Sequence, residues 1–148
     1  MRGYLNDAGE VRSYFVDLLN NNKKYFNTME KRNIRINLED KLFPVQAYFN
    51  SIPDRSFIRV LQDFSKNIGS GFEETSIGFP EEAEEWGDEP FKGVEFGIFE
   101  KEIIISNEDF IKYLRIVCNG YNKDHQHQKE EVEKLFNTIK VNFLSKNS

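Results

Sequence analysis

The sequence predicts an α+β fold: a small, mostly antiparallel sheet of three to four strands, packed with about four helices in a single domain. Three observations lead to this prediction. Apolar residues recur every three to four positions in four segments, as on the buried face of a helix. Apolar and polar residues alternate in three other segments, as in strands with one buried face. The segments follow the order αβαβββαα, and 148 residues bury enough surface for a core without a disulfide or metal.

The N-terminal part is expected to contain one helix and one strand. Residues 8–21 carry apolar side chains at helical spacing, which predicts an amphipathic helix. Ile34, Ile36 and Leu38 alternate with polar residues, which predicts a strand over residues 33–38.

A second helix is predicted over residues 54–68, directly after Pro53. Gly69 and Gly71 are expected to end it, because glycine readily adopts the left-handed conformation of a helix C-terminus. The buried face of this helix would be formed by Phe57, Ile58, Leu61, Phe64 and Ile68.

The centre of the chain is expected to form most of the sheet. Alternating apolar residues predict strands over residues 75–79 and 94–98. The apolar run at 103–105 follows so closely that it predicts a hairpin with its turn at Glu100 and Lys101.

The C-terminal part is expected to be helical. Ser106 followed by Asp109 is typical of a helix N-terminus closed by side-chain hydrogen bonds, so a helix is predicted over residues 107–121. A last helix is predicted over residues 127–143, where apolar residues again recur every three to four positions.

The charge is unevenly distributed. The net charge is -5, yet residues 67–100 contain ten acidic side chains and Lys92 as their only basic one. A surface of this sign repels phosphates, so direct binding to nucleic acid is not expected. No apolar run approaches the roughly 20 residues of a membrane span. The single cysteine, Cys118, suits a reducing cytoplasm and is interpreted as a small buried side chain.

The candidate partner-binding site lies in this acidic region, mostly in the loop expected between the strands at 75–79 and 94–98. Trp86 lies among the carboxylates, where a tryptophan is costly to expose but is favoured as an anchor in a protein interface. Two other interpretations remain: a solvated loop that aids solubility, and a calcium site, although the spacing lacks the pattern of an EF-hand loop. The proposed site residues are Glu73, Glu81, Glu82, Glu84, Glu85, Trp86, Asp88 and Glu89.

Catalytic and cofactor motifs are weak throughout. No G-x-S-x-G elbow is present, and the glycines near residue 70 follow a helix and lack the lysine of a P-loop. His125 and His127 could form half of a metal or nuclease site, but two exposed loop imidazoles are the simpler interpretation. We therefore predict no catalytic residues, no metal and no cofactor.

A succession of motifs nevertheless resembles a known family. In order along the chain they are FPVQAYF, SFIRVL, GSGFEET, FPEE, EPFKGVEFGIF and IISNEDF. Together they resemble the CdiI-type immunity proteins that neutralise ribonuclease toxins, over about residues 42–136. Residues 42–148 would then be the immunity-protein core, and residues 1–41 an N-terminal helix and strand extending the same domain. The resemblance implies a cytoplasmic inhibitor, not an enzyme, that binds the C-terminal ribonuclease domain of a cell-surface toxin.

Charge and resemblance together give a leading hypothesis. The chain would bind its cognate ribonuclease toxin by presenting an acidic surface to the basic cleft that holds RNA. The alternative is an acidic scaffold or regulatory module for another basic cytoplasmic partner, which the charge fits equally well. A toxin gene ending just upstream would favour the first hypothesis.

Overall fold

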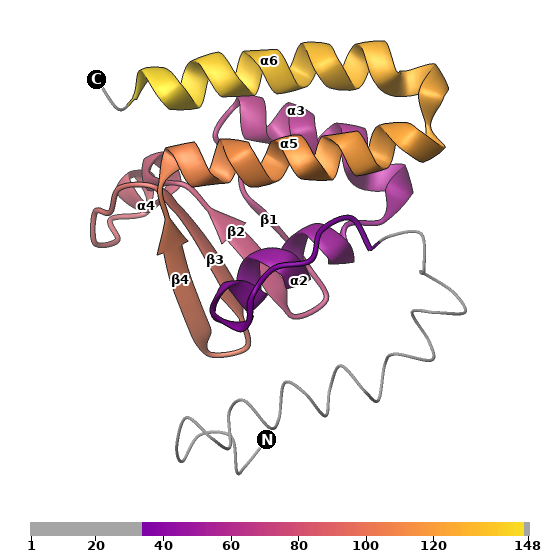
Figure 1. The fold of residues 1–148 in the computed structure, drawn as a ribbon. Helices are drawn as coiled ribbons and strands as arrows, with labels where there is room; N and C mark the ends of the chain where they lie inside the picture. Colours follow the sequence, from indigo (N-terminus) through magenta and orange to yellow (C-terminus); the bar gives the residue numbers. More distant parts are fainter. Residues whose placement is uncertain (1–33, 147–148) are drawn as a thin grey trace. The chain divides into compact units, whose positions relative to one another are not determined.

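The computed structural model describes residues 34–146, and the description below concerns the unit that begins at Arg35. It confirms the predicted α+β class: four antiparallel strands in the order β1-β2-β3-β4 pack with five α-helices in the described part (Figure 1). The strands are β1 Ser70–Phe72, β2 Thr75–Gly78, β3 Val94–Ile98 and β4 Lys101–Ile105. The α-helices are α2 Phe43–Ser51, α3 Phe57–Ser65, α4 Pro80–Glu85, α5 Asn107–Asp124 and α6 Lys129–Ser145. The helix predicted at residues 8–21 lies outside the described residues.

Helices α5 and α6 lie side by side above the sheet, with α3 packed against α6 (Figure 1). The predicted N-terminus of α5 is confirmed, since the Asp109 amide donates to Ser106 Oγ at 3.0 Å. In α6 the predicted apolar face is buried at Val132, Phe136 and Ile139. These long helices form because each buries a continuous apolar stripe.

The end of α3 differs from the prediction. The left-handed residue is Asn67, with φ of 61°, and neither Gly69 nor Gly71 has a positive φ. The Ile68 amide donates to the Asp63 carbonyl at 2.9 Å, which closes the helix three residues earlier than expected. Asparagine tolerates this conformation better than most residues, so Gly71 is free to enter β1.

Strands β2 and β3 confirm the two predicted alternating segments. The β3–β4 hairpin is also confirmed, but its two-residue turn is Phe99-Glu100, one position before the predicted one, and Phe99 has φ of 55°. Strand β1 was not predicted, because its Ser-Gly-Phe sequence has too few residues to show an alternation. It pairs with β2 through a turn at Glu73 and Glu74.

The strand predicted at residues 33–38 is wrong for the described residues 34–38, which join no sheet. The amides of Arg35 and Ile36 instead donate to Asn50 Oδ1, at 2.8 and 3.1 Å. The Asn50 side chain in turn donates to the Ile36 carbonyl at 3.0 Å. A side chain of α2 therefore satisfies the backbone groups that a neighbouring strand would otherwise pair.

The core lies between the sheet and the helices and is largely aromatic. Phe110 of α5 is fully buried, with ring centroids 5.0 Å from Phe143, 5.5 Å from Phe64 and 6.0 Å from Phe79. Phe79 belongs to this cluster and directly precedes α4. The acidic helix is thus attached directly to the aromatic core of the domain.

Candidate functional site

The acidic segment, residues 81–89, was expected to be a loop, but its first half forms helix α4. Pro80 occupies the first turn, where its missing N–H costs nothing. Glu81 and Glu82 lie in the same turn and complement the positive end of the helix dipole. The Glu82 carboxylate also accepts from the Phe79 amide at 3.4 Å. Local helix-forming chemistry therefore folds the carboxylates into a defined turn instead of a mobile loop.

The C-terminal end of α4 is fixed by a second set of hydrogen bonds. The Asp88 amide donates to the Ala83 carbonyl at 2.8 Å, and the Gly87 amide donates to the Glu84 carbonyl at 3.2 Å. Gly87 has φ of +76°, a conformation that glycine adopts without strain. This pairing is the Schellman arrangement, and it sets the direction in which the chain leaves the helix.

Trp86 lies between the two halves of the acidic segment and is 77% exposed. Glu84, Glu85 and Glu89 are also exposed, and within residues 34–146 none of them forms an ion pair. The segment therefore offers one large apolar side chain surrounded by carboxylates that remain available to a partner.

Glu81 differs from its neighbours because it binds within the domain. Its Oε2 lies 2.9 Å from Lys146 Nζ, at the end of α6. The same ammonium donates to Asn67 Oδ1 at 2.7 Å and lies 4.0 Å from the Phe143 ring centroid. This contact ties α4 to the ends of α3 and α6.

Seven of the eight predicted site residues are therefore adjacent in α4 and the loop that follows it. Glu73 is not with them, because it lies in the β1–β2 turn at the opposite end of β2 from α4. It has φ of 57° and its carboxylate accepts from Ser51 Oγ at 3.5 Å. The structure thus separates Glu73 from the acidic segment by the length of a strand.

Two carboxylates near the acidic segment, those of Glu95 and Glu102, were not predicted to belong to the site. Partial burial, the carboxylate of Glu102 and that of Asp88 together raise the pKa of Glu95 above its ordinary value. Glu95 lies on β3 and Glu102 on β4, and both point away from the core. The signal for Glu95 was its position between Val94 and Phe96, which are buried and alternate with it along β3.

The histidines lie elsewhere, at the junction of α5 and α6. The His125 ring stacks on Tyr121 at 3.9 Å, its Nδ1 lies 2.9 Å from the Tyr121 carbonyl, and its Nε2 lies 3.7 Å from Asp54 Oδ2. The His127 ring is 6.3 Å from that of His125. His125 is therefore packed against the domain, and only His127 is an exposed imidazole as expected.

Other reactive groups are accounted for by packing. Cys118 is fully buried, as predicted, and burial raises the pKa of its thiol to about 12. Within residues 34–146, no three His, Cys, Asp or Glu side chains are placed to hold a metal ion. No helix in that range has both the length and the apolar content needed to cross a membrane.

This geometry is that of a small α+β domain whose distinctive surface is a fixed acidic projection with an exposed tryptophan. Residues 23–136 match the family model described as CDI immunity protein, and the chain belongs to that family. The match begins 19 residues before the part for which motifs were recognised. A search of curated proteins found no match. Family membership gives the chain a toxin-neutralising immunity function, exerted by binding a cognate toxin.

Proposed function

We propose that this immunity protein neutralises a ribonuclease toxin in the cytoplasm, by covering the basic cleft of the toxin's C-terminal domain with the acidic segment. The proposal rests on one observation: a hydrogen-bonded helical projection presents exposed carboxylates around a tryptophan that is 77% exposed. A ribonuclease must attract phosphates, so its cleft carries Lys and Arg, and carboxylates complement them. Such an inhibitor needs no catalytic group of its own.

The direct test is inhibition of RNA cleavage. The toxin domain encoded beside this chain is mixed with one equivalent of the protein, and cleavage of a fluorogenic RNA is followed. Loss of cleavage together with co-purification of the two proteins supports the proposal. The proposal is contradicted if the toxin domain alone cleaves no RNA, or if it still cleaves RNA while bound to the protein.

Removing unpaired charges from the acidic segment should slow association. We expect the triple variant Glu84→Gln, Glu85→Gln and Glu89→Gln to bind an inactivated toxin domain about ten-fold more slowly at low salt. These three carboxylates form no ion pair in the described part, so the fold should be unaffected. Stopped-flow binding at about 50 and about 200 mM salt, conditions about two-fold apart in Debye length, measures the effect.

A matched control removes three charges from another surface. The variant Asp124→Asn, Glu130→Gln and Glu131→Gln changes the net charge equally, at exposed positions around the α5–α6 junction. It should bind with nearly parental kinetics. If both triple variants slow association equally, only the net charge of the protein matters, and the acidic segment is not the contact.

Replacing Trp86 should raise the rate at which the complex dissociates and leave the association rate nearly unchanged. If Trp86 is buried in the complex, Trp86→Ala costs about 2 kcal/mol or more, which is about 30-fold in the dissociation rate. Trp86→Phe keeps an aromatic ring and should lose less. Both variants should melt like the parent, since the side chain is largely exposed. Parental dissociation rates for Trp86→Ala would exclude this residue as an anchor.

A further inference from the structure

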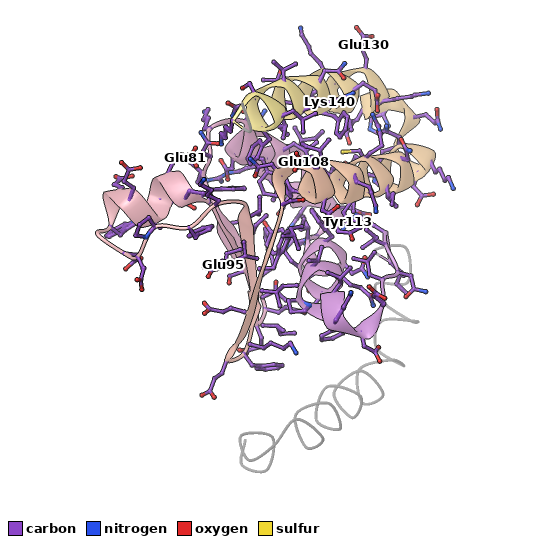
Figure 2. The ribbon with its side chains drawn as sticks, turned by 60° about the vertical axis from the view of Figure 1, so that its left-hand side comes forward. Glu81, Glu95, Glu108, Tyr113, Glu130 and Lys140 are labelled. Carbon is purple, nitrogen blue, oxygen red and sulfur yellow. The ribbon has the colours of Figure 1, made fainter. Side chains whose placement is uncertain are left out.

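One face of the sheet is left uncovered by the described helices. Side chains alternate along each strand, so those of Ile77, Phe96 and Ile105 point into the core, where α2 packs. Figure 2 shows the sheet nearly edge-on, with Glu95 directed away from the helices and α4 projecting beside it. We call the opposite surface the open face; its residues are Ser76, Gly78, Glu95, Gly97, Glu102 and Ile104.

Strand register arranges the open face in two rows. Gly78, Glu95 and Ile104 are paired across β2, β3 and β4 in one row, and Ser76, Gly97 and Glu102 in the other. Ser76 and Gly78 therefore lie on the β2 side of the face and Glu95 and Gly97 in its middle, while Glu102 and Ile104, the latter 50% exposed, lie on the edge strand β4. A partner can approach the backbone closely at Gly78, whereas Gly97 is buried beside the side chains of Ser76 and Glu102.

The fold does not require glycine at position 78. A Cβ built on it would meet only Glu95 Oε1, at 3.9 Å, and its φ is not in the left-handed region. By contrast, a Cβ on Gly93 would lie 2.2 Å from the Ile105 carbonyl oxygen, and Gly93 has φ of +100°. The space above Gly78 is thus open to a partner and can accept a larger side chain.

The open face and the acidic segment form one electrostatic surface. Asp88, in the loop after α4, and Glu102, on β4, both raise the pKa of Glu95. A cationic group placed among these three carboxylates would remove their mutual repulsion. A second copy of this chain would bring the same carboxylates together, and nucleic acid would bring phosphates, so both are electrostatically disfavoured.

We infer that the open face is a second half of the toxin-binding surface, on which a basic element of the toxin lies across β2, β3 and β4. Its Lys or Arg side chains pair with Glu95, Glu102 and Asp88, and an apolar group of the toxin contacts Ile104. This inference rests on the proposed function for the identity of the partner. It differs from that function in placing contacts on the sheet as well as on α4.

Two variants of the full chain test the open face independently. Gly78→Tyr places a ring over it and should raise the dissociation constant for the inactivated toxin domain at least ten-fold, at an unchanged melting temperature. Glu95→Gln with Glu102→Gln should slow association about ten-fold at low salt and reduce its salt dependence. The control Asn137→Tyr adds the same ring to the exposed side of α6 and should leave affinity unchanged.

The outcomes separate this inference from the proposed function. If the triple variant of the acidic segment loses affinity while both open-face variants bind like the parent, the contact is confined to α4 and the inference is wrong. If the parent does not bind the toxin domain, the proposed function and the inference both fail. A parental dimer that Gly78→Tyr dissociates in sedimentation velocity would assign the face to a second copy and also overturn the inference.

Discussion

Replacing Phe110 with alanine should lower the free energy of unfolding by about 3–5 kcal/mol, the usual cost of removing a buried phenylalanine ring. Phe110 is fully buried and its ring lies among those of Phe49, Phe64, Phe79, Phe96 and Phe143. These rings come from separate segments of the chain, namely α2, α3, the residue before α4, β3 and α6, so they cannot move together to fill the space. A typical domain of this size is stable by only about 5–15 kcal/mol, so the variant should be partly unfolded at physiological temperature.

Urea denaturation followed by circular dichroism measures this effect, with Ile116→Ala as the control on the same helix. Ile116 is 43% exposed, and alanine favours helix, so this variant should change stability by about 0.5 kcal/mol or less. Equal midpoints for the two variants would show that Phe110 does not organise the core. Because Phe79 contacts Phe110 and precedes α4, Phe110→Ala should also weaken toxin protection through loss of the fold.

Periodicity predicted the long elements because each buries one continuous face. Helices α3, α5 and α6 satisfy their backbone hydrogen bonds internally, so the spacing of their apolar residues was sufficient evidence. Strands β2 and β3 were found for the equivalent reason at period two. Helix α2 has the same signal, with Val45, Tyr48, Phe49 and the following Ile52 buried, but this nine-residue segment beginning Phe-Pro was not interpreted as a helix.

Residues 34–38 show that a local alternation pattern does not reveal whether a neighbouring strand is available for pairing. Their alternation is typical of a strand, yet their amides bond to Asn50, and to Gln46 in the case of Leu38 at 2.6 Å. Those partners lie 8 to 15 positions away along the chain. An extended backbone joins a sheet only where a strand with free groups is adjacent, and here a helix occupies that place.

The candidate site was predictable to the extent that it is continuous in sequence. Charge grouped residues 81–89, and α4 with the loop after it keeps them adjacent. Glu95 and Glu102 were missed because their proximity depends on the register between β3 and β4. Glu73 was included because it is close in sequence, yet β2 carries the chain away from it before α4 begins.

The second large effect is expected from Asp54→Ala, which should lower the free energy of unfolding by about 3 kcal/mol. The Arg35 side chain is 2% exposed, and its guanidinium donates to Asp54 Oδ1 at 2.6 Å and to the Phe49 carbonyl at 2.7 Å. Removing the carboxylate leaves a buried cation without this counter-charge, which costs more than the ion pair itself contributes. The Asp54 side chain is 20% exposed, so water can partly replace it, and the lower end of the usual 3–5 kcal/mol range applies.

Denaturation of three variants separates charge from packing at this position. Asp54→Asn keeps an oxygen that accepts from Arg35 but loses the charge. Its free energy of unfolding should therefore lie between that of the parent and that of Asp54→Ala. Asp124→Ala removes an exposed aspartate at the end of α5 and should change stability by about 0.5 kcal/mol or less. If Asp54→Ala is as stable as Asp124→Ala, the guanidinium of Arg35 must find equivalent partners, and the ion pair does not hold Arg35 against the turn at Asp54–Ser56.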